Sequence, residues 1–175
     1  MDDEECIRRW VSRLGAEAGC APLAAQGPED PGARRLWLWS ALHAVWSDQR
    51  LDPWLARRPR EGVHLEGFPP PLAALSQVVD GVAKRSESYI GDIEICNGYV
   101  ELGDYAEQES RFREVAELRR FHGHRPLPHP AALLQALQTG DGLPRCAGMA
   151  LGLERTLMAL LGTDDIAAVR PDLSR

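Results

Sequence analysis

The sequence has 175 residues, of which 44% are hydrophobic and 26% are charged, and its formal net charge is −6 at pH 7. This composition excludes an intrinsically disordered chain, and the length allows one domain with a real core. The acidic balance argues against a protein built mainly to coat nucleic acid, although it allows a local basic patch. The four cysteines lie far apart and form no Cys-x-x-Cys motif, so neither a zinc site nor a disulfide framework is indicated.

The sequence carries no sign of a secreted or membrane protein. It begins Met-Asp-Asp-Glu-Glu-Cys, which lacks the basic start and apolar core of a signal peptide. No apolar run approaches the roughly 20 residues of a membrane span. We therefore expect a cytoplasmic protein with reduced thiols and without a membrane partner.

Residues 1–60 are expected to form a helical N-terminal region interrupted by a linker. Apolar residues at helical spacing predict one helix over residues 4–14 and a second over residues 34–47. Between them, Ala, Gly and Pro accumulate, most densely over residues 21–33, which is typical of a linker. The second helix carries an apolar stripe that we interpret as core or as a partner-facing surface. The stripe consists of Leu36, Leu38, Trp39, Leu42 and Trp46, and it is widened by Trp37 and Val45.

A basic cluster and a short strand precede the central motif. The basic residues are Arg57, Arg58, Arg60, Lys84 and Arg85. We interpret them as solvated surface, with a phosphate or an acidic partner as the alternative. Residues 63–68 alternate like a strand and stop at three consecutive prolines.

Two turn signals divide the central stretch of the chain. Asn97-Gly98 lies between two alternating runs and predicts a two-residue hairpin loop, which would place Glu94 opposite Glu101. Ile90-Gly91 could form an earlier loop of the same length, which would place Glu87 opposite Glu94. The central stretch is therefore predicted to be an antiparallel meander.

That meander would align three carboxylates, those of Glu87, Glu94 and Glu101, on one face. The other face would collect apolar side chains, namely Ile93, Ile95, Val100 and Leu102. Because like charges on neighbouring strands destabilise a sheet, the row needs a compensating cation, either a metal or a substrate ammonium. A Glu-rich face that is simply solvated accounts for the pattern equally well.

The following stretch predicts helices and an exposed connector. Residues 105–121 should form a helix capped by Asp104, with Phe112, Val115 and Leu118 as its buried seam. A second, short helix is expected over residues 131–137. Three histidines between the two helices, His122, His124 and His129, invite a metal hypothesis. The prolines and glycine around them favour an exposed connector instead.

Near the C-terminus, an apolar strand that carries Gly148 and Gly152 leads directly into a helix at about Leu153. Small residues on a strand let a flat ligand approach the backbone closely. A helix N-terminus offers amide donors to an anion. Arg155 in the first helical turn slightly disfavours the helix through the macrodipole, so a phosphate partner would explain it. Packing alone is the other explanation for the glycines.

These two blocks together resemble class II aminoacyl-tRNA synthetases. Residues 148–155, Gly-Met-Ala-Leu-Gly-Leu-Glu-Arg, resemble motif 3, a Gly-rich strand followed by a helix with an essential arginine. Residues 94–102 resemble the stretch before motif 3 in lysyl-tRNA synthetases. The nearest resemblance is to the small tRNA-independent relatives that join β-lysine to a lysine of elongation factor P. These relatives share a pattern of Asn-Gly, Glu-Leu, Asp, Gln and Arg-Phe in that order. The matching residues here are Asn97, Gly98, Glu101, Leu102, Asp104, Gln108, Arg111 and Phe112.

The resemblance covers roughly residues 60–165 and implies a fold. We expect an α+β protein with a partial class II synthetase catalytic core over residues 61–165, in which helices flank an antiparallel sheet. Residues 166–175 would then be a C-terminal tail.

The resemblance also implies ATP and Mg²⁺ as cofactors and a role for each polar residue of the meander. Glu87 and Glu94 would hold Mg²⁺ on ATP. Asn97 and Glu101 would contact the amino-acid substrate, lysine or β-lysine, with Glu101 facing the side-chain ammonium.

In motif 3, Gly148, Ala150 and Gly152 would line the adenosine and amino-acid pocket, and Arg155 would bind the terminal phosphate. Glu94 and Arg155 would be the catalytic residues. The implied reaction is attack of an amino-acid carboxylate on the α-phosphate of ATP, followed by acyl transfer to a protein such as elongation factor P. Catalysis would rest on charge neutralisation and alignment.

One departure from the family pattern is large. Motif 1, which builds the family's dimer, and motif 2, whose arginine grips the α-phosphate, are not found in residues 1–60, and Glu154 replaces the usual Asp. The chain therefore resembles the C-terminal half of a synthetase core. Either a second synthetase-like chain or a second copy in a homodimer completes it, or it is a non-catalytic binding or regulatory module. A tRNA partner is the weakest of the hypotheses because the chain is acidic.

Overall fold

The computed structural model describes residue 13, residues 27–139 and residues 142–170. The predicted helix over residues 4–14 lies outside these ranges except for residue 13. The helices are α2 (Pro31–Trp46), α3 (Asp52–Ala56), α4 (Tyr105–Phe121), α5 (Ala131–Gln138) and α6 (Leu153–Leu161), with a π-helical turn at Ser47–Leu51 and 3-10 turns at Pro70–Leu72 and Ile166–Ala168. The strands are β1 (Gly62–Leu65), β2 (Val78–Val79), β3 (Val82–Ala83), β4 (Arg85–Ile90), β5 (Ile93–Val100) and β6 (Ala147–Leu151).

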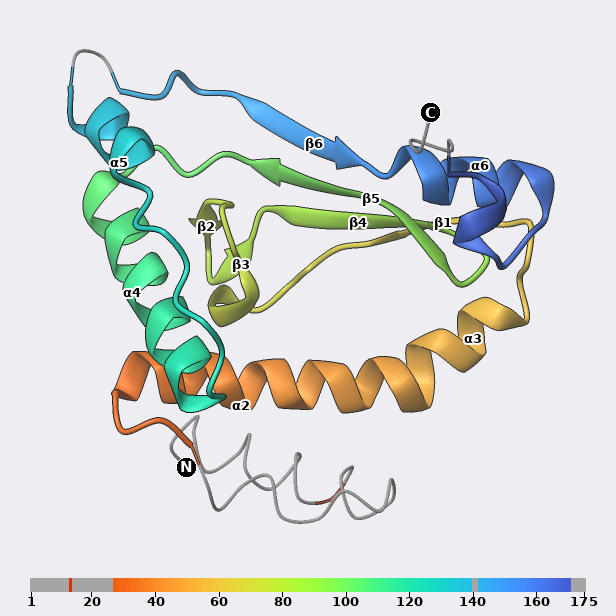
Figure 1. Ribbon diagram of the computed structural model, residues 1–175, viewed down its shortest axis with the longest axis horizontal. Helices are drawn as coiled ribbons and strands as arrows, with labels where there is room; N and C mark the ends of the chain where they lie inside the picture. Colours follow the sequence, from red (N-terminus) through yellow and green to blue (C-terminus); the bar gives the residue numbers. More distant parts are fainter. Residues whose placement is uncertain (1–12, 14–26, 140–141, 171–175) are drawn as a thin grey trace.

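A four-stranded antiparallel sheet organises the fold, with the strand order β1-β4-β5-β6. Strands β2 and β3 form a separate two-stranded sheet. In Figure 1, α2 runs along the side of the molecule opposite the large sheet, α4 and α5 stand at one end, and α6 continues from β6 at the other. The predicted α+β class, an antiparallel sheet flanked by helices, is confirmed.

The predicted hairpin loop at Asn97-Gly98 is wrong, because β5 runs through both residues without a break. Here β5 pairs with β4 on one side and with β6 on the other, so a turn would sacrifice ladder hydrogen bonds to two neighbours. The chain instead reverses at Gly91 and the residue after it, one position later than the predicted earlier loop. Gly91 has φ 60°, the left-handed conformation that such a turn requires.

The register of the meander therefore differs from the prediction. Glu87 lies opposite Asn97, and Tyr89 lies opposite Glu94, whereas the sequence suggested that glutamate would face glutamate. A β-bulge between Ser88 and Tyr89 shifts the pairing by one residue. The bulge keeps Glu94 on the same face as Glu87, so the glutamates share a face without standing directly opposite one another.

Helix α2 confirms the second predicted helix. Asp30 caps it, since its side chain accepts a hydrogen bond from the backbone N–H of Ala33 at 2.8 Å, and Pro31 occupies the first turn. Trp37 and Leu38 are its most deeply buried large side chains, so the predicted stripe holds at Leu38, and Trp37, which was expected only to widen the stripe, lies in the core. Trp37 makes an edge-on ring contact with Phe121 of α4, at 6.0 Å between ring centroids.

Helices α4 and α5 also follow the prediction, and the Asp104 cap is confirmed by a hydrogen bond of 2.7 Å from the N–H of Glu107. The predicted buried seam of α4 is wrong at Val115, whereas Leu118 is half-buried and packs against the cluster of Trp37 and Leu38. Val115 is 40% exposed, and the buried side chain is Gln108, which is 2% exposed. Val115 is exposed because it borders the open space between α4, α2 and residues 70–75.

Two apolar clusters lie on the glutamate side of the sheet. One packs Leu51 and Leu55 against Tyr89, and the other brings Phe68 together with Ala73 and Ala83. Because Tyr89 shares its face with Glu87, the segment that ends in α3 covers part of the face on which the candidate site lies.

In the described ranges, no group of three or more His, Cys, Asp or Glu side chains is arranged to hold a metal ion. The connector that carries the three histidines is exposed, as its prolines and glycine suggested, and the rings of His122 and His124 lie 5.9 Å apart. None of the helices in that same part of the chain is long and apolar enough to cross a membrane.

Candidate functional site

The Glu87 carboxylate is the buried centre of the candidate site, with the residue 6% exposed. One oxygen accepts a hydrogen bond of 2.6 Å from the Tyr89 hydroxyl. The other accepts from the Arg85 guanidinium and, at 3.1 Å, from the Asn97 side-chain amide. Both oxygens are thus satisfied, as a buried carboxylate requires. Two effects contribute most to raising the pKa of Tyr89 above its ordinary value: burial, which is the larger, and the hydrogen bond to Glu87. The phenol therefore stays protonated and acts as the donor.

Arg85 corrects the interpretation of the basic cluster as solvated surface. Its guanidinium donates to the backbone carbonyl of Leu72 at 2.8 Å and to the Asn97 side-chain oxygen at 3.3 Å, in addition to its ion pair with Glu87. It also lies over the ring of Phe68, 4.4 Å from the centroid. The protein therefore supplies one of the compensating cations that the carboxylate row needs. Strand alternation places Arg85 on the same face as Glu87, two residues away, and this is the sequence signal for their pairing.

Glu94 and Arg155 form the second charged pair of the site. The guanidinium Nη1 of Arg155 lies 3.4 Å from the Glu94 carboxylate and 3.3 Å from its backbone carbonyl. The other Glu94 oxygen is 3.5 Å from the Asn97 side-chain amide. Asn97 thus links the two glutamates, and the arginine that opens α6 reaches the same face. Unlike Glu87, both members of this pair are partly exposed.

Glu101 completes the row at the β6 side. A Cβ built on Gly148 would lie 2.1 Å from a carboxylate oxygen of Glu101, so this side chain occupies the space above the glycine. Gly148 pairs with Tyr99, and Ala150 pairs with Asn97, so these small residues of β6 border the same face. Gly152 sets the start of α6, where its carbonyl accepts from the N–H of Thr156 at 2.9 Å. A Cβ there would make ordinary contact with Arg155 at 3.5 Å.

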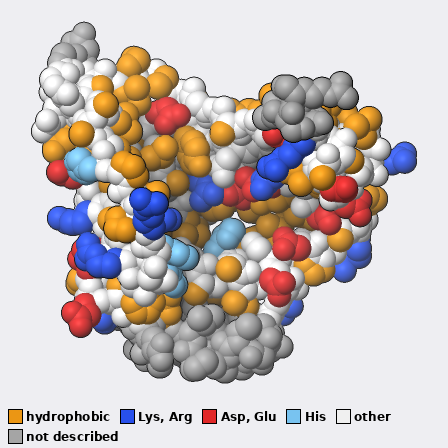
Figure 2. All heavy atoms as spheres, viewed as in Figure 1, with side chains coloured by type: hydrophobic (Ala, Val, Ile, Leu, Met, Phe, Trp, Pro, Cys, Tyr) orange, Lys and Arg blue, Asp and Glu red, His pale blue; other side chains and the backbone are white. Residues whose placement is uncertain are grey.

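His43 of α2 faces this site and was not predicted from the sequence. Burial lowers the pKa of His43, the nearby Glu87 raises it, and Arg85 lowers it, which places the imidazole within the field of that ion pair. Its ring lies 5.7 Å from that of Phe68, and its buried Nε2 has no hydrogen-bond partner. Figure 2 shows a hollow between the strands and the lower helices, with basic, acidic and histidine side chains around it.

The side chains present fit Mg²⁺ that arrives with a nucleotide. Magnesium takes hard oxygen ligands and is usually held by one or two protein carboxylates together with substrate phosphates. Glu94 offers a partly exposed carboxylate. The side-chain amide of Asn97 contacts both this carboxylate and that of Glu87, so the two carboxylates lie on either side of it. The adjacent Arg155 would supply a positive charge that neutralises a phosphate. Glu87 is the less available of the two carboxylates because both its oxygens are already bonded.

Comparison with known proteins relates the part of the chain that carries this site to a protein family. Residues 64–171 match the family described as tRNA synthetases class II (D, K and N). The chain is also 40% identical over 105 residues to proteins named elongation factor P–(R)-β-lysine ligase from Salmonella dublin, Salmonella paratyphi B and Salmonella heidelberg. Each alignment covers 58% of this chain and 32% of the relative, so the chain spans about a third of the length of the curated relatives it matches.

The family match includes every predicted site residue, from Glu87 on β4 to Arg155 on α6, and leaves His43 outside it. An antiparallel sheet with a glutamate-bearing face and an arginine at the start of the helix after the last strand is the arrangement that the sequence led us to expect. The chain belongs to the class II tRNA synthetase family.

Proposed function

We propose that this chain provides the amino-acid and nucleotide pocket of an ATP-dependent ligase that activates lysine or β-lysine and transfers it to a protein acceptor such as elongation factor P. A second synthetase-like chain, or a second copy of this one, would complete the site with the features of motifs 1 and 2. The observation that carries the proposal is the linked set Glu87, Asn97, Glu94 and Arg155, which three hydrogen-bonded contacts join on one face.

Each residue of the set has a chemical task in this proposal. Arg155 neutralises charge on the terminal phosphate, and Glu94 and Glu87 hold Mg²⁺, which when bound neutralises charge on the phosphate oxygens. Asn97 and Glu101 position the amino acid, with Glu101 as the counter-charge for a side-chain ammonium. Gly148, above which the Glu101 carboxylate lies, would line the adenosine and amino-acid pocket together with Ala150 and Gly152.

The reaction class is attack of an amino-acid carboxylate oxygen on the α-phosphorus of ATP, with pyrophosphate as the leaving group. An acceptor amine then displaces AMP from the activated carboxyl. In this chain, alignment and charge neutralisation would carry the catalysis, because the site contains no covalent nucleophile in its linked set. A clamp on the α-phosphate is worth about 3 kcal/mol or more in comparable sites, which is why the completing chain matters.

A non-catalytic binding or regulatory module is the second candidate. It is favoured by the internal charge balance of the site, in which Arg85 pairs with Glu87 and Arg155 pairs with Glu94. Because these two glutamates already have arginine partners, they do not depend on a nucleotide to compensate their charge. Such a module would bind the amino acid or nucleotide without turning it over.

The first experiment measures binding of Mg·ATP, lysine and (R)-β-lysine to the full chain by calorimetry. We expect Glu94→Gln and Arg155→Ala to weaken Mg·ATP binding at least tenfold. Two matched controls are available in the exposed pair of α4: Glu117→Gln and Arg120→Ala remove the same groups from an ion pair outside the site. They should leave binding within twofold. Absence of binding of all three ligands to the wild-type chain, or equal effects of site and control variants, would refute the proposed pocket.

The second experiment separates the two candidates. The tagged chain is purified with its bound partners, and ATP–pyrophosphate exchange is measured for the assembly and for the lone chain with lysine or β-lysine. Exchange by the assembly that Glu94→Gln abolishes supports the ligase. Ligand binding without exchange in any assembly supports the non-catalytic module, and normal exchange after Glu94→Gln would exclude the role of this residue.

A further inference from the structure

Strand β6 leaves one edge of the large sheet open. Among the residues that the structure describes, β6 pairs with β5 alone, and it is the last strand of the sheet (Figure 1). Two hydrogen bonds fix which of its residues face β5. Gly152 donates its N–H to the carbonyl of Ile95 at 2.9 Å, and the carbonyl of Cys146 accepts from the N–H of Glu101 at 3.0 Å. Since backbone groups alternate in direction along a strand, residues 147, 149 and 151 turn theirs towards the open edge.

The three residues at this edge also expose apolar side chains. Ala147, Met149 and Leu151 project from the face opposite to that of Gly148 and Ala150. Met149 is 68% exposed and Leu151 is 50% exposed. An edge strand with open N–H and C=O groups and apolar side chains is a template for pairing with a further strand.

Helix α6 extends this apolar strip beyond the strand. Its exposed leucines follow the i, i+4, i+7, i+8 spacing of a stripe that a helix of a globular protein ordinarily buries. They are Leu153, Leu157, Leu160 and Leu161, each at least 43% exposed. Together with Met149 and Leu151 they form an apolar surface, which we call the β6–α6 surface. Exposed apolar patches of this kind mark sites of protein association.

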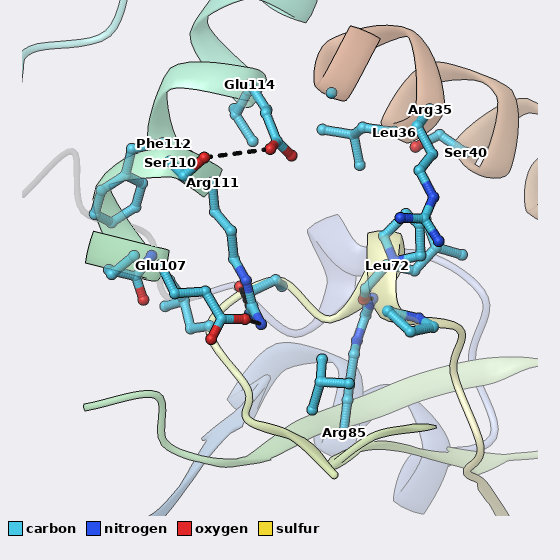
Figure 3. A pocket seen from close by; sticks show the side chains of 18 of the residues that line it. Arg35, Leu36, Ser40, Leu72, Arg85, Glu107, Ser110, Arg111, Phe112 and Glu114 are labelled. Atoms are coloured by element: carbon cyan, nitrogen blue, oxygen red, sulfur yellow. Dashed lines mark hydrogen bonds and ion pairs between the residues drawn. The ribbon is translucent and has the colours of Figure 1, made fainter. Parts of the chain in front are cut away.

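The cavity of about 690 Å³ between α2 and α4 differs from this surface, because its charged groups already have partners. Figure 3 shows Arg111 close to Glu107, with which it forms an ion pair, and Arg85 in the same cavity is paired with Glu87. These groups do not require a partner from outside the chain.

The charges at the two ends of β6 indicate which partner fits the open edge. Arg145 precedes the strand and Glu154 follows it. Neither side chain forms a hydrogen bond or an ion pair within residues 27–139 and 142–170. If β6 pairs antiparallel with β6 of a second copy, the start of each strand meets the end of the other. Arg145 of each copy then approaches Glu154 of the other, so the edge is complementary to itself, as a twofold interface requires.

We propose that the β6–α6 surface binds a second copy of this chain, with the two β6 strands paired antiparallel about a twofold axis at Met149. In this register Met149 lies opposite Met149 of the second copy, and Ala147 lies opposite Leu151 of the second copy. All the backbone groups at the open edge are then paired, because each such pair of residues exchanges two hydrogen bonds. The same register brings Leu153 of the second copy to Arg145 and to Leu143, which is 38% exposed.

This dimer narrows the proposed function, which leaves the completing chain open. The second copy would continue the sheet beside Gly148 and Ala150, on the face that carries the candidate site. Association is measured without any ligand. If the dimer fails to form, the ligase proposal therefore still stands with a different completing chain.

The first test measures the oligomeric state of the full chain by sedimentation equilibrium over a range of concentrations. We expect a dimer at micromolar concentration and at least a tenfold weaker dimer for Leu151→Lys, because a lysine on an edge strand opposes strand pairing. Leu127→Lys is the matched control, since Leu127 is 63% exposed and lies in the connector between α4 and α5. It should dimerise as the wild type does. Both variants change exposed side chains, so both should melt at the temperature of the wild type.

The second test examines the antiparallel register by exchanging charges. Arg145→Glu and Glu154→Arg each create two like-charged contacts across the twofold axis, so each should weaken the dimer at least fivefold. The double variant restores opposite charges at both contacts and should dimerise as the wild type does. Arg120→Glu, in the exposed ion pair of α4, should leave dimerisation unchanged.

Three results would overturn the proposal. A wild-type chain that stays monomeric at submillimolar concentration would exclude the dimer. A dimer that Leu151→Lys leaves intact would use another surface. Weakening by both single charge variants without recovery in the double variant would exclude the antiparallel pairing of the two β6 strands.

Discussion

The guanidinium of Arg155 lies 3.4 Å from the carboxylate of Glu94, although 61 residues separate the two in the sequence. Strand β6 creates this proximity, because it pairs with β5 and then delivers the chain into α6 beside the start of β5. Gly152 fixes the junction by donating its N–H to the carbonyl of Ile95 at 2.9 Å. The two parts of the candidate site are thus joined by sheet pairing rather than by any local signal.

Arg155→Ala should affect ligand binding far more than stability. Both side chains of the Arg155–Glu94 pair are partly exposed, and such pairs contribute about 0–1 kcal/mol. We expect the free energy of unfolding, measured with urea, to fall by less than about 1 kcal/mol. A loss above about 2 kcal/mol would show that the arginine has a structural role instead.

Arg85→Met should be strongly destabilising, because it leaves the buried carboxylate of Glu87 without its cationic partner. Breaking a buried ion pair by removing one member costs about 3–5 kcal/mol. Urea unfolding should therefore show a large loss, and the double variant Arg85→Met, Glu87→Gln should recover a substantial part of it. Additive losses would contradict the coupling.

Arg58 provides the matched control for this prediction. Its guanidinium also lies over an aromatic ring, that of Trp54 at 3.8 Å, and pairs with a carboxylate, that of Glu61 at 3.6 Å. This pair is on the surface, so Arg58→Met should cost less than about 1 kcal/mol. Equal costs at the two arginines would mean that burial does not distinguish them.

Gly148→Ala should change the amino-acid site while preserving the fold. The new Cβ would displace the carboxylate of Glu101, which is the flexible end of its side chain. A forced rotamer costs about 0.5–1.5 kcal/mol, and the loss of glycine entropy in the unfolded chain returns about 0.4–1 kcal/mol. We expect the stability to stay within about 1 kcal/mol and lysine binding to fall at least tenfold by calorimetry.

The control for Gly148 is Gly62→Ala in β1, where a Cβ meets no atom within 4 Å. It should leave lysine binding unchanged. If Gly148→Ala binds lysine as the wild type does, the Glu101 carboxylate does not contact the amino acid from its position above Gly148.

The stability of the fold should depend on the protonation of His43. Because burial lowers the pKa of His43 in the folded state, the unfolded chain takes up this proton first as the pH falls below about 6.5. The neutral His43 therefore makes its full contribution to stability above that pH. The contribution is lost as the pH falls towards the pKa of His43 in the folded state. The wild type should therefore lose more stability between pH 7.5 and 5.5 than His43→Phe, measured by urea unfolding at each pH. Parallel losses in the two proteins would contradict the prediction.

The cap of α4 makes the last prediction. Because Asp104 accepts from the N–H of Glu107, Asp104→Ala should lower the free energy of unfolding by about 1 kcal/mol, whereas Asp104→Ser should change it by only a few tenths. Urea unfolding of both variants checks this. An equal loss in both would mean that the negative charge, rather than the cap hydrogen bond, is what matters.

The sequence by itself determined the local elements and the family. Helical spacing predicted α2 and α5, and helical spacing with the Asp104 cap predicted α4, because these signals depend on residues within one or two turns. The strand that leads into α6 was recognisable from small residues followed by an amphipathic segment. The motifs alone mark the glutamates and Arg155 as candidate site residues.

The tertiary structure decided which partners these residues have. Asn97-Gly98 is a strong local turn signal, yet it lies in a continuous strand because β4 and β6 pair with it on both sides. Likewise, Arg85 became the partner of Glu87 only because Phe68 and Leu72 close over it. Long-range pairing and burial outweigh a local preference of about 1 kcal/mol, and neither can be read from the residues nearest in the chain.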